Sequence, residues 1–380
     1  MSVFSALFTS KITRMLAAVE KGILAEVVDV CATDTSLIRA KNGKGRTALH
    51  VAAAAGHTEL IQWLVANKAD IDASSSDGSM PLHLALAGHH TAATECLLNL
   101  GANVNGTRKD ATTPLHLAVA AGDTSLADKL LQRGATTNCH DKDGVTPLHI
   151  AVRNSRDDLV LALLNHKADP NMHDGKGYSA LHRAFVNGQG LIVERLLKGG
   201  GDINLPLSNG QTVLHWAAGM GVIEAVCFLL DHGANVNAKS HHGATPLFVA
   251  VTEQKYNVVE LLLQRGADTN LQGPGGNTAL HNAILLSNQK LAEVLIANGT
   301  NIEAKNNDGL SPLHVAAFVY WKSGQTGNKC FDKKAAFEVA KLLLSKGADA
   351  NARDKSGQTP MNLGYYGEMG NLLKEYGGTY

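Results

Sequence analysis

Residues 113–123 have the sequence TPLHLAVAAGD, and 33 residues later the chain repeats it as TPLHIAVRN at residues 146–154. Steps of 33 residues from Thr47 to Ser311 give nine positions, and eight of them hold Thr or Ser. All nine have Leu two residues later and Ala five residues later, and eight have His three residues later. A random sequence of the same composition would not keep these residue types at the same 33-residue spacing over nine repeats. The 380 residues are therefore predicted to form a repeat array rather than two or three ordinary domains.

Each position of the repeat has a chemical role. The Thr or Ser suits a helix N-cap, and the Pro that follows it in five repeats suits the first helical position. The Ala keeps this first helix thin, so that neighbouring repeats can stack closely. A Leu pair and then Gly-Ala, as at Gly134, predict a second helix that ends in a left-handed residue. Lys68 and Lys167 occupy that Gly position, so each is expected to be strained in a left-handed conformation. Ala111 replaces a Gly of a hairpin.

This pattern resembles the ankyrin repeat, over about residues 12–375. The resemblance implies an all-α repeat solenoid, in which each unit is a helix-turn-helix with a β-hairpin finger. It also implies that partners contact the fingertips and the exposed, concave face of the first helices.

The departures from the pattern define the expected domains. Residues 1–43 lack the T-P-L-H motif and are predicted to be an N-terminal capping unit, and residues 357–380 a C-terminal one. Residues 44–356 hold nine repeats. The ninth carries about 15 additional residues at about 320–336, with four Lys and one Asp, which we expect to form a basic loop.

Composition limits the classes of function. Lys and Arg together number 34, as do Asp and Glu, which disfavours a nucleic-acid binder. No apolar run approaches the ~20 residues of a membrane span, so no membrane insertion is expected. The five Cys form no close pair, which favours a reducing compartment and a cytoplasmic location. The repeats give no reason to expect more than a monomer.

The sequence contains no catalytic or phosphate-binding motif, so we expect no enzyme activity, no cofactor and no metal. The motif His residues are predicted to be structural, as half-buried rings that bond backbone between repeats. One alternative remains, an enzyme or small-ligand binder built on the ninth-repeat insertion, with Cys330 as nucleophile and His314 as its base.

Variable positions of the repeat point to a binding surface. Large apolar side chains gather at these positions in the C-terminal repeats, beside the insertion, and such clusters are typical of interaction sites. The candidate partner-binding residues are Arg153, Tyr178, Met220, Leu285, Leu286, Leu310, Phe318, Tyr320 and Trp321. The insertion could instead fold back and bury Leu285, Leu286 and Phe318.

The favoured hypothesis is a non-catalytic scaffold that binds a protein or an extended peptide, and no nucleic acid. The family resemblance is compatible with two settings. One is a cytosolic adaptor, and the other is a bacterial effector that acts in the cytoplasm of a host cell.

Overall fold

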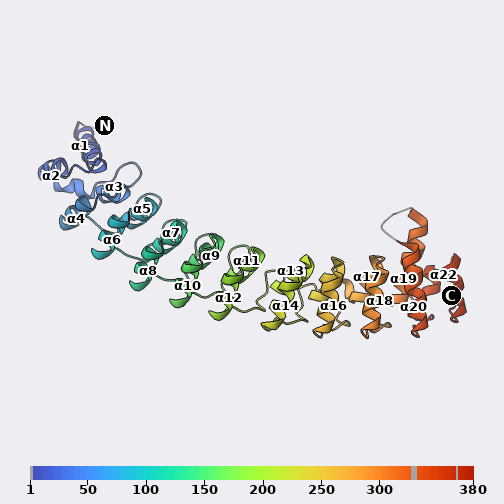
Figure 1. Ribbon diagram of the computed structural model, residues 1–380. Coiled ribbons are helices and arrows are strands. Elements are labelled where there is room, and N and C mark those ends of the chain that lie inside the picture. The colour runs from blue at the N-terminus through green and yellow to red at the C-terminus, as the bar shows by residue number, and fades with distance from the viewer. Residues whose placement is uncertain (1–2, 327–331, 365–366) are drawn as a thin grey trace. The chain divides into compact units, whose positions relative to one another are not determined.

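The computed structural model describes residues 3–326, 332–364 and 367–380 (Figure 1), and the side chains of residues 10–323, 332–364 and 367–380. The chain divides into two compact units, Met1–Asp202 and Ile203–Tyr380. Both are built from helices. Among the described residues there is no strand, and the fingers show a single isolated bridge, between His173 and Ser179. The predicted all-α repeat fold is confirmed.

The first unit begins with a long helix and continues as helix pairs that lie side by side in chain order (Figure 1). First helices pack against first helices of the next repeat, and second helices against second helices. Its elements are α1 (Val3–Glu20), α2 (Leu24–Thr33), the 3-10 helix η1 (Thr35–Arg39), α3 (Ala48–Ala55), α4 (Thr58–Ala66), α5 (Pro81–Ala87), α6 (Thr91–Asn99), α7 (Pro114–Ala121), α8 (Thr124–Gln132), α9 (Pro147–Arg153), α10 (Asp157–Asn165), α11 (Ala180–Val186) and α12 (Gly190–Lys198).

The second unit repeats the same arrangement of helix pairs. Its elements are α13 (Val213–Met220), α14 (Ile223–Asp231), α15 (Pro246–Thr252), α16 (Tyr256–Gln264), the 3-10 helix η2 (Pro274–Gly276), α17 (Ala279–Leu285), α18 (Gln289–Ala297), α19 (Pro312–Thr326), α20 (Lys333–Ser345), α21 (Pro360–Gly364) and α22 (Gly367–Glu375).

The motif His connects the start of each first helix to the next finger. In seven repeats its Nδ1 accepts a hydrogen bond from the backbone N–H of the N-cap residue, at 3.1 to 3.3 Å. The proton therefore sits on Nε2, and in six repeats Nε2 donates to a backbone carbonyl of the following finger, at 2.9 to 3.1 Å. The eight rings are at most 3% exposed. The prediction of half-buried rings was wrong, because the next finger covers each ring.

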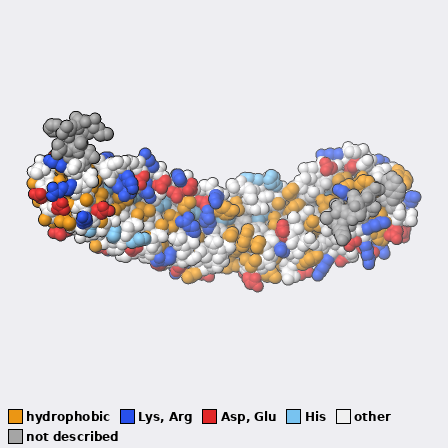
Figure 2. All heavy atoms as spheres, turned by 90° about the horizontal axis from the view of Figure 1, so that it is seen from above, with side chains coloured by type: hydrophobic (Ala, Val, Ile, Leu, Met, Phe, Trp, Pro, Cys, Tyr) orange, Lys and Arg blue, Asp and Glu red, His pale blue; other side chains and the backbone are white. Residues whose placement is uncertain are grey.

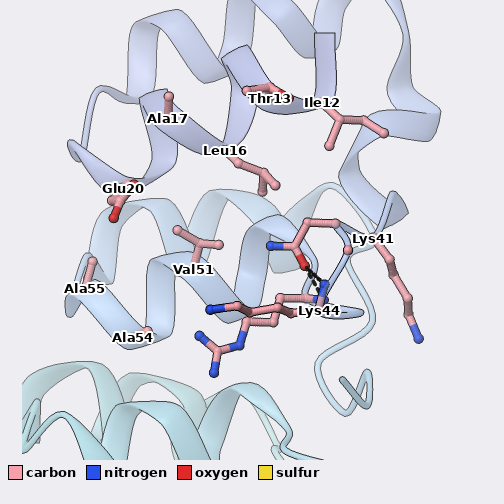
Figure 3. A pocket seen from close by; sticks show the side chains of 13 residues that line it. Ile12, Thr13, Leu16, Ala17, Glu20, Lys41, Lys44, Val51, Ala54 and Ala55 are labelled. Carbon is pink, nitrogen blue, oxygen red and sulfur yellow. Dashed lines mark hydrogen bonds between the residues drawn. The ribbon is translucent and has the colours of Figure 1, made fainter. Parts of the chain in front are cut away.

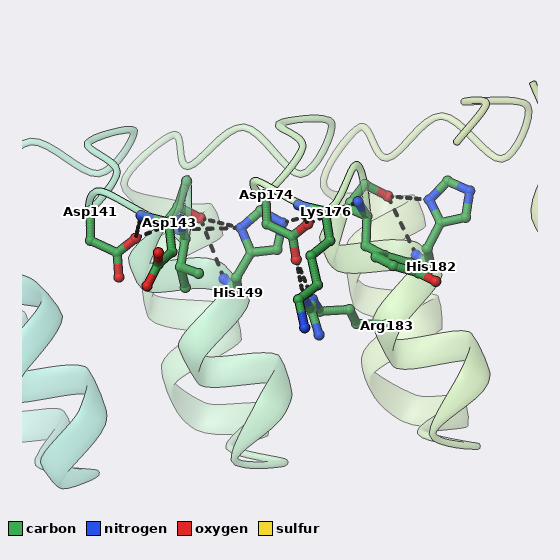
Figure 4. Close-up of polar contacts among 11 residues, drawn as sticks. Asp141, Asp143, His149, Asp174, Lys176, His182 and Arg183 are labelled. Atoms are coloured by element: carbon green, nitrogen blue, oxygen red, sulfur yellow. Dashed lines mark hydrogen bonds and ion pairs between the residues drawn. The ribbon is translucent and has the colours of Figure 1, made fainter. Parts of the chain in front are cut away.

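Turn bonds give each finger a fixed shape. In Figure 4, Asp174 Oδ1 accepts from the backbone N–H groups of Lys176 and Tyr178, at 2.9 and 3.0 Å, and Oδ2 pairs with Arg183. The Asp174 side chain is 1% exposed. Burial alone would raise the pKa of this carboxyl, but the backbone bonds and the Arg183 guanidinium hold it below its usual value.

Backbone hydrogen bonds also link neighbouring fingers. Within the first unit, Ser76 N–H donates to the Lys44 carbonyl, and the same bond recurs in the next three fingers. In the second unit it joins His241 to Asn209 and Asn307 to Gly275. Pro274 stands at the donating position of its own finger and has no N–H to offer, so that link of the series cannot form.

The ninth repeat differs from its prediction. The insertion was expected to be a loop, but it mainly lengthens two helices: α19 has 15 residues where other first helices of the repeats have seven or eight, and α20 has 13. Asp332 caps α20 by accepting from the backbone N–H groups of Lys334 and Ala335. The helical conformation is more stable than a loop because it buries Tyr320, Ala335 and Ala336 between α19 and α20. Residues 327–331 lie outside the described residues.

The two expected left-handed lysines are confirmed, since Lys68 and Lys167 have φ values of 66° and 63°. Ala111, which replaces a hairpin Gly, is also left-handed, with a φ of 61°. Such a conformation costs a residue with a Cβ atom on the order of 1–2 kcal/mol, and glycine avoids that cost.

Lys68→Gly is expected to raise the free energy of unfolding by roughly 0.5 kcal/mol, since relief of the left-handed strain exceeds the added entropy of the unfolded chain. A urea titration measures the effect. The matched control is Lys109→Gly, an exposed finger lysine whose φ is not positive, and it should not stabilise. An equal gain in both variants would contradict the strain argument.

Acidification should destabilise the fold through the motif histidines. Burial lowers the pKa of all eight, and that of His83 and of His182 to about 4. An unfolded histidine titrates near pH 6.5. Between about pH 6.5 and 4 the unfolded chain therefore binds more protons, and stability falls as the pH falls.

From pH 7 to pH 5, the loss should be about 2 kcal/mol for each histidine whose pKa is about 4. Urea titrations at both pH values measure it. His83→Phe, which copies the natural Phe248 of the seventh repeat, should remove one histidine's share of the pH dependence. An unchanged pH dependence in that variant would refute the assignment.

Candidate functional site

A hollow of about 520 Å³ opens in the second unit, and residues of three fingers and three first helices line it. We call it the C-terminal hollow. Its lining combines apolar side chains from the helices with polar side chains from the fingers. The lining residues are Asn277, Leu285, Asn306, Asp308, Leu310, Val315, Phe318, Asp354, Lys355, Ser356, Gln358 and Leu363.

The apolar part comes from consecutive repeats. Leu285 lies at the end of α17, Leu310 in the finger that precedes α19, and Phe318 on α19. All three are half-buried, so each keeps part of its surface open to a partner. The Phe318 ring lies 6.0 Å from that of Trp321, and Lys322 Nζ lies 5.3 Å from its centroid. These neighbours fix the Phe318 ring at the edge of the hollow.

Buried histidines position the finger walls. His281 Nε2 donates to the Leu310 carbonyl at 3.0 Å, and His314 Nε2 to the Gln358 carbonyl at 3.1 Å. Inside the finger of residues 306–310, Asn306 Oδ1 accepts from the backbone N–H groups of Asp308 and Leu310. Hydrogen bonds thus fix both ends of the finger that carries Leu310.

The rim of the hollow carries charges of both signs. Asp308, Asp354 and Lys355 share the lining, which leaves one excess negative charge. Asp354 Oδ1 is committed to its own turn, where it accepts from Ser356 N–H and Gln358 N–H at 2.8 Å. Sequence reasoning missed these acidic groups, although Asp308 stands at one of the variable positions of the repeat.

The other candidate residues lie elsewhere. Leu286 follows α17 and is half-buried, but it does not line the C-terminal hollow. Met220, at the end of α13, is 57% exposed, and Trp321 is 37% exposed. Arg153 and Tyr178 belong to the first unit, where Arg153 is exposed and the Tyr178 ring lies 5.4 Å from the Arg183 guanidinium. For these residues a role in binding stays a prediction.

Tyr320 is 4% exposed, so its prediction as a surface anchor was wrong. The ring lies 6.2 Å from that of Phe337 on α20, and Lys333 Nζ lies 4.7 Å from its centroid. Tyr320 is buried because the insertion continues α19 and packs α20 against it. Leu285, Leu286 and Phe318 stay half-buried, so the insertion does not bury them as core.

The proposed nucleophile–base pair lacks an available base. His314 is fully buried, with Nδ1 accepting from Ser311 N–H and Nε2 donating to the Gln358 carbonyl. Cys330 lies outside the described residues. Both ring nitrogens of His314 are thus used by the fold, and the ring could take a proton from a thiol only by giving up one of these bonds.

Two further observations on the described part of the chain concern metal sites and membrane spans. No group of three or more His, Cys, Asp or Glu side chains is placed to hold a metal ion. None of the helices there combines the length and the apolar character that a membrane crossing requires. On the face in Figure 2, basic and acidic side chains are interspersed.

Comparison with known proteins identifies the repeat. The family model for three ankyrin repeats matches residues 15–108, 93–174, 115–206 and 181–273. The chain belongs to the ankyrin repeat family. A model for many ankyrin repeats also matches residues 262–316, and one for a single ankyrin repeat matches residues 308–355. Ankyrin repeats generally serve as modules of protein–protein interaction.

Solved structures show the same fold. The ankyrin repeat domain of Bcl-3, described as a unique member of the IkappaB protein family, is 29% identical to this chain with a TM-score of 0.51. The match covers 60% of this chain and 98% of that domain. No curated protein matches the chain in sequence.

The structural role of Tyr320 can be tested by two substitutions. Tyr320→Ala should lower the free energy of unfolding by about 3–5 kcal/mol, because it leaves a cavity between α19 and α20. Tyr320→Phe should leave stability unchanged or slightly higher, since the hydroxyl has no hydrogen-bond partner among the described residues. Urea unfolding measures both. A stable Tyr320→Ala variant would mean that this ring is not core.

Proposed function

We propose that this chain is a non-catalytic scaffold that binds a protein partner through a peptide segment seated in the C-terminal hollow. One observation carries the proposal. Leu285, Leu310 and Phe318, three variable positions from consecutive repeats, line one open hollow of about 520 Å³. Most of the large apolar side chains on the helices are buried between repeats, and half-exposed ones that share a recess are typical of an interaction site.

Side chains, rather than finger backbone, must recognise this partner. The N–H groups of Asp308, Gly309 and Leu310 all bond within their own finger, and that of Lys355 donates to the Asp308 carbonyl. An added strand would need free backbone donors. The partner is therefore expected to insert an apolar side chain beside Phe318.

The charge of the rim indicates what flanks that apolar side chain. Asp308 and Asp354 outnumber Lys355, so a Lys or Arg next to the inserted residue would be favoured. The expected ligand is a peptide segment with an apolar anchor and basic neighbours. Its contribution to affinity comes mainly from the apolar contacts, since exposed ion pairs are weak.

The cellular role belongs to the same proposal. A scaffold of this kind fits a cytoplasmic adaptor, or an effector that acts inside a host cell, and works as a monomer. General use of ankyrin repeats in protein–protein interaction supports the binding role. The choice between adaptor and effector rests on the partner that is identified.

The test is selection from a random peptide library with the purified chain, followed by affinity measurement on the selected peptides. Selected peptides should share an apolar residue next to Lys or Arg. Leu310→Ser/Phe318→Ser should weaken their binding at least roughly tenfold, as expected for the loss of two apolar contacts.

Val222→Ser is the matched control, because Val222 is an exposed apolar residue of the same unit outside the hollow. It should change the affinity less than about twofold. Circular dichroism checks that all variants fold. Peptides that bind the double variant as tightly as the wild type would refute the proposed site.

A further inference from the structure

A second hollow, of about 710 Å³, lies within the first unit between α1, α3 and the first finger. We call it the N-terminal hollow. Figure 3 shows Ile12 and Leu16 on α1 above Val51 on α3. Lys44 and Arg46, from the finger at residues 42–46, complete the lining at one end.

The hollow exists because a long helix lies over small side chains. α1 has 18 residues and α3 has eight, so α1 extends past the finger. At the end of α3 the lining consists of Ala54 and Ala55. The same two register positions of the ninth repeat hold Phe318 and Val319, and side chains of that size would fill the space.

The cations of this hollow have no acidic partner. Lys44 and Arg46 form no ion pair within the described residues. Lys41 also lines the hollow, but its Nζ donates to the Ser74 carbonyl at 2.9 Å, and Figure 3 shows it directed away from α1. Seven other cations of the first unit do have acidic partners, namely Arg14, Arg108, Lys129, Arg156, Arg183, Arg195 and Lys198.

Charge is separated along the hollow. Glu20, its one acidic residue, lies at the end of α1, whereas Lys41, Lys44 and Arg46 belong to the finger region. Figure 3 shows Glu20 on α1 and Lys44 on the finger below it. The hollow thus combines an apolar floor with a field that is positive at the finger.

We propose that the N-terminal hollow binds an acidic peptide segment that carries an aliphatic or aromatic side chain. The apolar side chain enters between Leu16 and Val51, and carboxylates on either side of it pair with Lys44 and Arg46. This site is separate from the C-terminal hollow and does not depend on the function proposed there.

The observations favour a peptide over other polyanions. Nucleic acid is bound by long basic grooves with aromatic platforms, and anionic membranes by clusters of about four to eight basic residues. Here two unpaired cations border a recess with an apolar floor. That geometry matches one buried side chain with carboxylates beside it.

The probe is a fluorescein-labelled peptide, Asp-Glu-Asp-Leu-Phe-Asp-Glu-Asp, titrated with the full chain and followed by fluorescence anisotropy. Lys44→Glu/Arg46→Glu should weaken its binding at least roughly tenfold, because repulsion replaces attraction. Leu16→Gln, which keeps the charge and removes apolar floor, should weaken it roughly fivefold. Binding to the wild type should also weaken as salt is added.

The control variant is Lys142→Glu/Lys176→Glu, which makes the same charge change on exposed lysines of other fingers in the same unit. It should bind the probe almost as well as the wild type. Equal weakening by the control would overturn the proposal, as would equal binding of a peptide with Ser-Ser in place of Leu-Phe. Absence of probe binding, with tighter binding to phosphatidylserine vesicles or single-stranded DNA, would overturn it in favour of those ligands.

Discussion

The rest of the structure depends on the hydrogen bonds of the buried motif histidine. Its Nδ1 accepts from the N-cap of its own helix, and its Nε2 donates to the carbonyl of the next finger. One neutral ring therefore fixes where a helix begins and where the following finger lies. The variable side chains that the finger and helix carry are then repeated at a constant spacing. In the C-terminal hollow the same bonds hold Leu310 and Gln358 in place. The same hydrogen bonds therefore stabilise the fold and position the binding surface. Protonation of the ring is expected to weaken both.

The ninth repeat shows how this constraint tolerates an insertion. Motif histidines in five repeats bond a carbonyl 29 residues ahead, whereas His314 bonds Gln358, 44 residues ahead. The difference of 15 residues equals the length of the insertion, so the added chain leaves the junction with the next finger unchanged. The insertion buries its own apolar residues, above all Tyr320, between α19 and α20. Phe318 stands two residues earlier, about 200° around the helix, on the face that lines the hollow. The core side chain Tyr320 and the hollow-lining side chain Phe318 thus lie on different faces of α19.

The sequence predicted what local chemistry determines. N-caps, helix pairs and the left-handed Lys68 follow from residue types at fixed register, and so does the placement of Leu285, Leu310 and Phe318 on a variable face. Burial of Tyr320 could not be predicted in this way, because the insertion has no counterpart in the other repeats and its burial depends on helix α20. The N-terminal hollow was also missed. Ala54 and Ala55 look uninformative in the sequence, and the space above them depends on the length of α1.

These residues show how one register position can serve two kinds of recognition. Where it holds Phe318, the repeat presents an anchor that a partner can pack against. Where it holds Ala54, the repeat leaves a recess that a partner's side chain can fill, provided that a neighbouring helix supplies the opposite wall. Charge then selects the ligand, because the rim is set by finger residues that do not take part in packing. Asp308 and Asp354 border the first surface, and Lys44 and Arg46 the second. Since the motif histidines keep the backbone the same in both places, a change of specificity needs only side-chain substitutions at positions that cost little stability.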